Sequence, residues 1–210
     1  MTNEFGPKIK KGYDSIADVW NEKREWYIEQ ESIDKAISYL EKGASILDVG
    51  CGSGKPIAAY LLSKGYDVYG IDISEKQVEH AKNIIPKENL FVADIFSFST
   101  TVTFDAIICW FTIFHIHANQ HPEVLKKLHS LLKPKGILLI TFADTSIEPE
   151  GTDLTIIDEH TIESEMFGER FYHSGNPASI NSQIVKSVGF KIIGDKIDQP
   201  GNQVILAMKE

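Results

Sequence analysis

The sequence predicts an α/β fold built around a doubly wound, mainly parallel sheet, and three observations lead to this prediction. From Ser45 onward, short apolar runs alternate with amphipathic segments, as expected for buried parallel strands joined by helices. The glycine-rich turn "GCGSG" at 50–54 follows the first apolar run, at the strand end where such sheets present their sites. The last two apolar runs, joined by "QPGN", have the pattern of a β-hairpin. Right-handed crossovers then place helices on both faces of the sheet.

The segment before the first predicted strand is expected to be helical over residues 8–42. It includes "SIADVWNEKREWYIEQ", continues with apolar residues on one helical face, and ends at Gly43. We interpret it as a helical cover over the sheet. The apolar residues of its second half are Ile33, Ala36, Ile37 and Leu40.

Five apolar runs are predicted to be the parallel strands, and the segments between them to be helices. Ser74 and Gln77 fit a capping box at the start of one helix. A second helix has an apolar face that ends near Gly136, which we expect to close it. The strand runs are 45–50, 67–72, 90–94, 104–111 and 136–143, and the apolar face is Val124, Leu125, Leu128, Leu131 and Leu132.

Residues 144–175 depart from this alternation of strand and helix patterns, because they are polar and contain a proline and several glycines. We interpret them as an insertion, or lid, between the fifth strand and the last helix. That helix is expected to begin at Asn176–Pro177, with proline in its first turn. Residues 1–210 are expected to form a single domain.

Composition and charge narrow the classes of function. The net charge of −9 and the pI near 5.3 argue against a nucleic-acid partner, because such proteins usually carry a basic face. No apolar run reaches the roughly 18 residues of a membrane span, and the first residues lack a signal-peptide pattern. Cys51 and Cys109 have no CxxC spacing for zinc. We therefore expect a cytoplasmic protein with reduced thiols, without a membrane or nucleic-acid partner, acting as a monomer or homodimer.

The glycine loop is open to three interpretations. A phosphate-binding P-loop needs glycine where Val49 stands and a hydroxyl where Pro56 stands. A dinucleotide loop needs a third glycine at the position of Lys55. The glycines instead fall at 50, 52 and 54, with Asp48 two residues before the first. This spacing leaves a backbone open enough to contact a ribose and an amino-acid tail.

The motif "LDVGCGSG" closely resembles the first motif of class I S-adenosylmethionine-dependent methyltransferases. The resemblance covers nearly the whole chain. It implies a Rossmann-like, seven-stranded sheet whose last strand is antiparallel, and S-adenosyl-L-methionine as cofactor. The cofactor-binding residues that it implies on the loop are Asp48, Gly50, Cys51 and Gly52.

The same resemblance assigns the acidic residues that end the next two strands. Asp72 is expected to hold both ribose hydroxyls, because a carboxylate only accepts hydrogen bonds and hydroxyls can donate them. Asp94 is expected to receive the adenine amino group, while Ile73 and Ile95 pack on the adenine faces. The alternative is that Asp72 and Asp94 only cap helices, as aspartate often does after a strand.

The N-terminal "YDSIADVWNEKR" resembles the first helix of many small-molecule methyltransferases. By that resemblance Tyr13 and Trp20 cover the methionine end of the cofactor, and Arg24 faces its carboxylate. Tyr13 and Trp20 could equally be aromatic residues that pack helices together.

His115, just past the fourth strand, is the candidate catalytic base, because imidazole can take a proton near neutral pH. Trp110 and Phe111 are expected to wall the methyl site. His115 could instead be a buried histidine bonded to the backbone. His117 and His121 lie nearby, but without a carboxylate or cysteine to complete a set we expect no metal. The insertion is expected to determine acceptor specificity, and the alternative is that its polar residues form a solvated lid. The residues concerned are His160, Glu163, Arg170, Tyr172 and His173.

We therefore predict a methyltransferase that transfers a methyl group in line from S-adenosylmethionine to a small-molecule acceptor. One alternative is a regulatory module that binds the cofactor without transfer. A second is a nicotinamide-dependent oxidoreductase, which Lys55 and the terminal hairpin disfavour.

Overall fold

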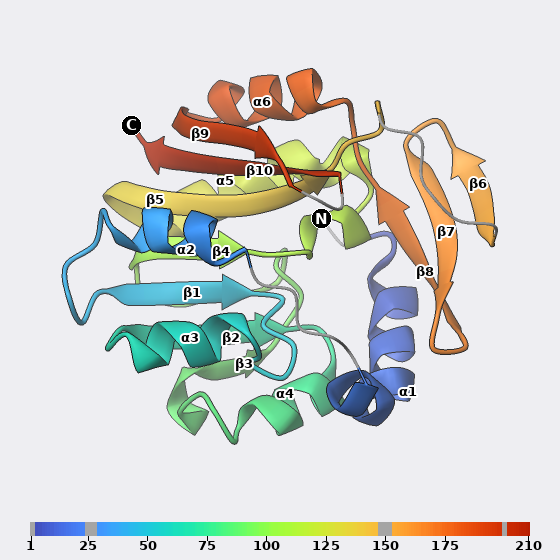
Figure 1. Cartoon of the computed structure of the whole chain (residues 1–210), viewed down its shortest axis with the longest axis horizontal. Coiled ribbons are helices and arrows are strands. Elements are labelled where there is room, and N and C mark those ends of the chain that lie inside the picture. The colour runs from blue at the N-terminus through green and yellow to red at the C-terminus, as the bar shows by residue number, and fades with distance from the viewer. Residues whose placement is uncertain (1–2, 24–28, 147–152, 199–200) are drawn as a thin grey trace.

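A computed structural model of the chain describes residues 3–23, 29–146, 153–198 and 201–210 (Figure 1). Its centre is a seven-stranded sheet in the order β3-β2-β1-β4-β5-β10-β9. The pairs from β3 to β5 are parallel, whereas β10 is antiparallel to both β5 and β9. The predicted Rossmann-like sheet with an antiparallel last strand is therefore confirmed. Its strands are β1 Ser45–Val49, β2 Asp67–Asp72, β3 Leu90–Val92, β4 Phe104–Cys109, β5 Leu132–Ala143, β9 Phe190–Ile197 and β10 Asn202–Lys209.

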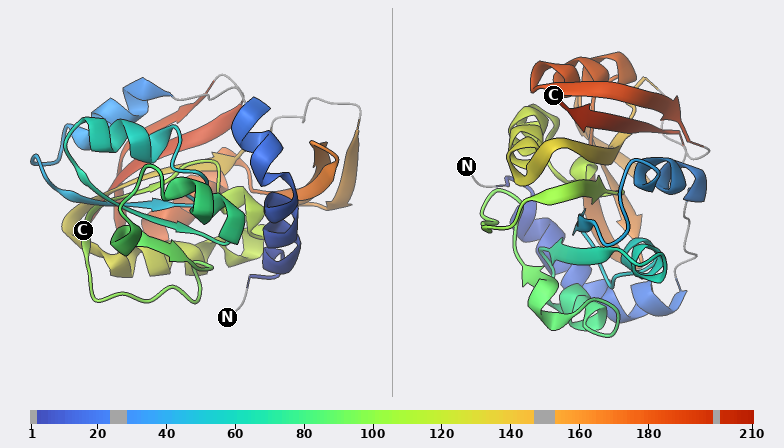
Figure 2. Two further views of the ribbon diagram at one scale, coloured as in Figure 1. Left: turned by 90° about the horizontal axis from the view of Figure 1, so that it is seen from below. Right: turned by 90° about the vertical axis from the view of Figure 1, so that its left-hand side faces the viewer.

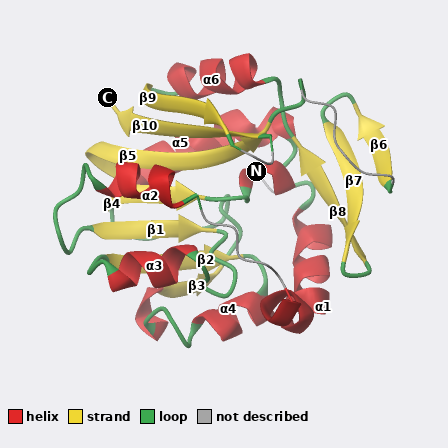
Figure 3. Cartoon of the chain, viewed as in Figure 1, coloured by secondary structure: helices red, strands yellow, loops and turns green. Residues whose placement is uncertain are grey.

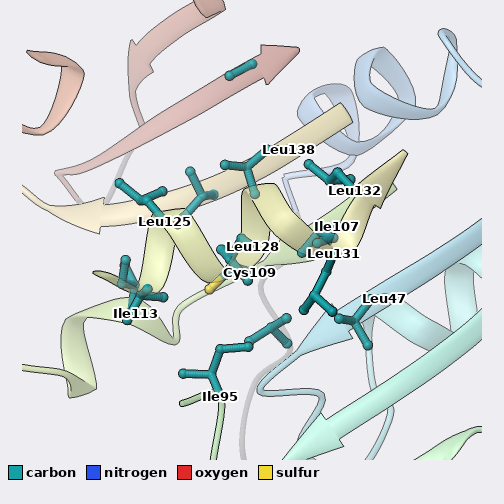
Figure 4. Packing of buried hydrophobic residues seen from close by; sticks show 14 of the residues in the cluster. Leu47, Ile95, Ile107, Cys109, Ile113, Leu125, Leu128, Leu131, Leu132 and Leu138 are labelled. Carbon is teal, nitrogen blue, oxygen red and sulfur yellow. The ribbon is translucent and has the colours of Figure 1, made fainter. Parts of the chain in front are cut away.

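Helices cover both faces of this sheet, as Figure 3 shows. On one face, α5 (His121–Leu131) and α6 (Ala178–Ser187) pack on alternate residues of the strands. Figure 4 shows part of this cluster, in which Leu125 and Leu128 of α5 lie near Cys109 of β4. On the other face, α2 (Gln30–Ile37) and α3 (Ile57–Ser63) pack on the remaining residues. Both faces of β1, β4 and β5 are thus buried, which accounts for their nearly continuous apolar sequences.

A helix and a second, smaller sheet stand beside the main sheet, at the end where the parallel strands finish. The helix is α1 (Gly6–Lys23), and the small sheet contains β6 (Leu154–Asp158), β7 (Thr161–Met166) and β8 (Glu169–Ser174). Figures 1 and 2 show α1 next to β8 from three directions. The small sheet occupies the predicted insertion 144–175, whose strands the sequence analysis did not identify.

Two expectations about helix ends have different outcomes. Half of the predicted capping box forms at α4 (Glu75–Ala81): the Ser74 hydroxyl oxygen accepts the backbone N–H of Gln77 at 3.1 Å. The reciprocal bond does not form, because the Ser74 N–H donates to Asp72 and not to the Gln77 side chain. Gly136 does not close the preceding helix, so that prediction is wrong. α5 already ends at Leu131, and β5 begins at Leu132. The positive φ of 64° lies at Lys135, inside the strand.

Short 3₁₀ turns complete the fold: η1 Lys87–Asn89, η2 Ile113–His115 and η3 Ala118–Gln120. Of these, η2 and η3 connect β4 to α5, so the chain crosses the end of the sheet before it enters the helix. No helix within the described ranges is long and apolar enough to span a bilayer.

Candidate active site

A cavity of about 360 Å³ lies at the carboxyl ends of β1, β2 and β4, beneath α1. Residues from the glycine loop, the strand ends, η2, α1 and the small sheet line it. Twelve of the site residues predicted from the sequence are among them. They are Tyr13, Trp20, Asp48, Gly50, Cys51, Gly52, Asp72, Ile73, Asp94, Ile95, Trp110 and His115.

The glycine loop turns sharply after β1, and its glycines adopt the left-handed conformation. The φ angles of Gly50, Gly52 and Gly54 are 73°, 52° and 81°. A Cβ atom on Gly50 would lie 2.2 Å from Oγ1 of Thr112, so the loop packs directly against the segment after β4. By contrast, a Cβ atom on Gly52 would have no neighbour closer than 3.9 Å. The backbone is therefore tight at Gly50 and open at Gly52.

Asp72 holds the glycine loop and the next helix together while lining the cavity. Its carboxylate accepts hydrogen bonds from the backbone N–H groups of Gly52 at 2.9 Å and Ser74 at 2.8 Å. Burial raises the pKa of Asp72 to about 6. Each carboxylate oxygen has further acceptor capacity. Asp72 thus fixes the residue that caps α4 without capping the helix itself, and it remains able to accept hydrogen bonds from hydroxyl groups.

Asp48 is the most deeply buried carboxyl group of the site, with only 2% of its surface exposed. Burial raises the pKa of Asp48 to about 8, and the nearby charge of Asp72 adds to this effect. No protein group in the described part of the chain donates a hydrogen bond to it. A cationic group in the cavity would favour its ionised form.

Asp94 lies two residues past the end of β3 and also lines the cavity. Its Oδ1 atom accepts the backbone N–H of Phe96 at 2.9 Å, as in an aspartate turn. The neighbouring Ile95 is buried, and Ile73 is half-buried. These two apolar side chains lie beside the two carboxylates, which is the arrangement expected of a surface for a flat ring with polar edges.

The half of the cavity that contains Asp48, Asp72 and Asp94 also has three polar atoms in its wall without a hydrogen-bond partner among the described residues. They are Oγ of Ser53, Nε2 of Gln77 and Nε1 of Trp110, and all three residues line the cavity. Buried polar groups are rarely left unsatisfied. Together with the open backbone at Gly52, they fit a polar cofactor such as S-adenosylmethionine. Ser53 and Gln77 were not predicted; Ser53 lies inside the glycine motif, which could have indicated it.

The opposite half of the cavity contains a chain of hydrogen bonds from α1 to the small sheet. The Tyr13 hydroxyl lies 2.9 Å from Nε2 of His115, and Nδ1 of His115 lies 2.9 Å from the carbonyl oxygen of Tyr172. A carbonyl can only accept, so Nδ1 carries a proton and Nε2 accepts from Tyr13 in the neutral ring. His115 is indeed bonded to the backbone, as its alternative interpretation held, and its other nitrogen still faces Tyr13.

Aromatic side chains surround this pair. Phe114 stacks on His173 with ring centroids 5.4 Å apart, and Trp20 packs edge-on against Tyr13 at 5.7 Å. Burial lowers the pKa of His173 to about 4, which keeps this ring uncharged near neutral pH. Phe114 was not predicted as a site residue. It follows β4 in an aromatic run, where only Trp110 and Phe111 were singled out.

Of the five candidate residues in the insertion, His173 lines the cavity and Tyr172 contributes its carbonyl group. Glu163 and Arg170 instead pair with each other at 2.7 Å, and Glu163 also pairs with Lys8 of α1. His160 is half-buried and absent from the lining. Arg24 lies outside the described residues.

The neighbouring histidines support the backbone. Nε2 of His121 donates to the carbonyl oxygens of Ile113 and Ile116, at 3.1 and 2.9 Å, and so fixes the turn that carries His115. His117 pairs with Asp158 at 3.3 Å. These rings point to different partners. Among the described residues there is no group of three or more His, Cys, Asp or Glu that could hold a metal ion.

A small hydrophobic cluster joins α1 to β8 above the cavity. Phe171 is fully buried and packs against Tyr13, with ring centroids 4.8 Å apart. A Cβ atom on Gly12 would lie 2.6 Å from the Phe171 ring, so only glycine permits this approach. α1 and the small sheet therefore cover the cavity as one packed unit.

Comparison with known proteins identifies similar chains. A family model described as "Methyltransferase domain" matches residues 20–192. The 27-O-demethylrifamycin SV methyltransferase of Amycolatopsis mediterranei is 27% identical over 164 residues, 67% of this chain and 60% of that protein. An uncharacterized methyltransferase of Oceanobacillus iheyensis is 28% identical over 131 residues, 61% of this chain and again 60% of the relative. The match thus spans about 60% of the length of these relatives.

Solved structures share the fold. The 1,6-didemethyltoxoflavin-N1-methyltransferase of Burkholderia thailandensis, with its substrate and S-adenosylhomocysteine bound, superposes with a TM-score of 0.70 at 16% identity, over 97% of this chain and 86% of that one. The magnesium protoporphyrin IX methyltransferase of Synechocystis, with S-adenosylmethionine bound, gives 0.69 at 17% identity, over 100% and 99%.

Proposed function

This chain belongs to the methyltransferase domain family, and we propose that it transfers a methyl group from S-adenosylmethionine to a small-molecule acceptor. The observation that carries the proposal is one cavity with two unlike halves. Buried carboxylates and unsatisfied polar atoms line the first half, and aromatic rings with a Tyr–His pair line the second. The first half suits the cofactor and the second an acceptor.

The cover formed by α1 and β8 supports a small acceptor. It lies across the cavity and is held by Phe171 and by the Lys8–Glu163 pair. A folded protein or a nucleic-acid duplex would meet this cover before the cavity. The names of two similar proteins, which act on a demethylrifamycin and a didemethyltoxoflavin, agree with a small acceptor.

We assign the cofactor contacts to the residues of the first half. Asp72 would accept the ribose hydroxyls, Asp94 the adenine amino group, and Ile73 and Ile95 would pack on the ring. Asp48 would face the positively charged part of the cofactor. When bound, the cofactor supplies a methyl group already activated by its sulfonium.

The remaining task of the protein is to align the acceptor and to exclude water. Correct orientation of two reactants can lower a barrier by about 7–11 kcal/mol. Tyr13 and Trp20, which the resemblance places over the methionine end of the cofactor, would also border the acceptor together with Phe114. The buried surroundings would keep water from the methyl group. His115 is placed to receive a proton from that half of the cavity.

The proposal is tested with cofactor labelled in its methyl group and a metabolite extract. We expect a labelled small molecule, detected by mass spectrometry. Tight binding of the cofactor with no labelled product from any extract would favour the regulatory module instead. Affinity for NADH and none for S-adenosylhomocysteine would favour the oxidoreductase.

The variant Asp72→Ala tests the cofactor half. Loss of its hydrogen bonds should weaken S-adenosylhomocysteine binding by about 1.5–3 kcal/mol, measured by calorimetry. Because Asp72 also accepts the backbone N–H of Ser74, the matched control is Ser74→Ala. This variant removes the cap of α4 and the hydrogen bond to Asp14, but no cavity residue. The control should lose about 1 kcal/mol of stability and little affinity. Equal affinity losses in both variants would contradict the assignment.

A further inference from the structure

We propose that the methyl acceptor is an uncharged aromatic compound with a hydroxyl group, and that Tyr13 and His115 relay the hydroxyl proton during transfer. The inference rests on the function proposed above and deepens it. Two independent features lead to it, the distribution of charge in the cavity and the direction of the hydrogen bonds at His115.

Among the residues that the structure describes, charged side chains line one half of the cavity. They are Asp48 and Asp72 at the carboxyl ends of β1 and β2, Lys55 on the glycine loop, and Asp94 just past β3. The other half is formed by residues without a formal charge: Tyr13, Trp20, Phe111, Phe114, His115, Met166 and His173.

This distribution selects against charged acceptors. An ionised group that leaves water without a partner loses several kcal/mol. A carboxylate would need a cation, and Lys55 is exposed on the far loop. An ammonium would need a carboxylate, and the three in the lining belong to the cofactor half. An uncharged acceptor avoids both costs, and the stacked rings of Phe114 and His173 offer it a flat wall.

The hydrogen bonds at His115 run in one direction. Tyr172 contributes a carbonyl oxygen, so Nδ1 of His115 donates to it at 2.9 Å. Nε2 is then the acceptor for the Tyr13 hydroxyl, also at 2.9 Å. The Tyr13 oxygen in turn can accept a proton from a group in the cavity. A hydroxyl group there would complete a path from acceptor to Tyr13 to His115.

The step conserves atoms and charge. The acceptor oxygen forms a bond to the methyl carbon, and the sulfur–methyl bond breaks with its electron pair moving to sulfur, which leaves S-adenosylhomocysteine. The hydroxyl proton moves to the Tyr13 oxygen while the Tyr13 proton moves to Nε2 of His115. The positive charge lost at sulfur appears on the imidazolium ring, which keeps its bond to the Tyr172 carbonyl. The proton then leaves to water.

An aromatic hydroxyl matches this relay better than an aliphatic one. The ordinary pKa of a tyrosine side chain is about 10, and the acceptor hydroxyl of a phenol is chemically the same group. Proton transfer between two phenols is nearly balanced in energy, which favours relay catalysis. Among the described residues, the titratable side chains of Tyr13 on α1 and His173 on β8 contact His115, and burial lowers the pKa of His173 to about 4.

The substrate class is tested with compounds of matched shape. The hydroxyl probes are 2-naphthol and a larger hydroxyanthraquinone; the charged probes are 2-naphthoate and 2-naphthylmethylamine. We expect O-methylation of the hydroxyl probes alone, detected by mass spectrometry. Preferred methylation of the carboxylate or the amine, or failure of both hydroxyl probes, overturns the inference. If labelled product still forms from the metabolite extract, the proposed function stands without it.

The relay is tested with Tyr13→Phe and His115→Gln, assayed on whichever hydroxyl probe is methylated. Both should lower kcat by about 10²- to 10⁴-fold with little change in S-adenosylhomocysteine affinity, which also shows that they fold. The control is Tyr66→Phe, whose hydroxyl donates to the Ile37 carbonyl outside the cavity. An unchanged kcat in Tyr13→Phe overturns the relay.

Discussion

Replacement of Asp48 by asparagine should stabilise the protein at alkaline pH while weakening its hold on the cofactor. The Asp48 carboxyl is 2% exposed, and its pKa is raised from 3.8 to about 8. The folded chain therefore keeps a proton that the unfolded chain releases between about pH 4 and pH 8. Over this window the free energy of unfolding falls as pH rises, because the folded state binds more protons.

The size of the effect follows from the shift. About four pKa units, at about 1.36 kcal/mol each, set an upper limit of about 5 kcal/mol near pH 9. Asparagine has nearly the same shape and no charge, so Asp48→Asn removes this pH-dependent loss. The difference in unfolding free energy between variant and wild type should grow from near zero at about pH 4 to several kcal/mol at about pH 9.

Urea unfolding at several pH values measures this difference directly. Comparing variant with wild type cancels the contributions of the buried histidines, whereas the interaction between Asp48 and Asp72 is part of the measured difference. Asp67→Asn, an exposed carboxyl at the opposite end of the sheet, is the control and should show no such trend. Calorimetry should find weaker cofactor binding in Asp48→Asn only. A variant that is no more stable than wild type at pH 9 would refute the reasoning.

Two further predictions concern glycines. Gly50→Ala should lower the free energy of unfolding, measured in urea, by about 2–5 kcal/mol. Its φ of 73° strains a side chain by about 1–2 kcal/mol, and its Cβ would overlap Thr112. The control Gly43→Ala, with a φ of 78° and no neighbour within 4 Å, should lose only the backbone strain of about 1–2 kcal/mol, and equal losses in both variants would contradict this. Gly12→Ala should destabilise the cover and reduce methyl transfer, because its Cβ would lie 2.6 Å from the Phe171 ring. Without this overlap, alanine would stabilise a helix interior by about 1 kcal/mol. A gain in stability would count against the reasoning, as would a double variant with Phe171→Leu that is no more stable than Gly12→Ala alone.

The cofactor half could be predicted because its residues are local in sequence. The glycine turn, Asp72 and Asp94 each follow a strand, and the carboxyl ends of neighbouring parallel strands meet at one edge of the sheet. All the predicted residues of this half do line one cavity. Gln77 was missed because its role depends on the side that α4 turns toward the loop, and a capping pattern alone does not give that.

The small sheet could not be predicted because its strands lack an alternating apolar pattern. In β6 every residue after Leu154 is exposed, and Phe171 is the only fully buried apolar side chain in β8. Such strands are stabilised by pairing with each other and by a few contacts with α1, rather than by a sheet face buried along its length. Gly136 was misjudged for a related reason, since Leu132 continues the helical stripe yet pairs with Phe104 in the sheet.

The acceptor half is assembled from distant parts of the chain, and this bears on how it works. Tyr13 and His115 are 102 residues apart in sequence, and Tyr172 is 57 residues beyond His115. Each hydrogen bond between them joins a different element, so the relay exists only when α1 and β8 are both packed over η2. Gly12 and Phe171 hold α1 on β8, and the Phe171 ring also packs against Tyr13. The loss of transfer expected in Gly12→Ala should therefore resemble that of Tyr13→Phe, with a lower kcat and nearly normal cofactor binding, whereas damage to the glycine loop should lower cofactor affinity first.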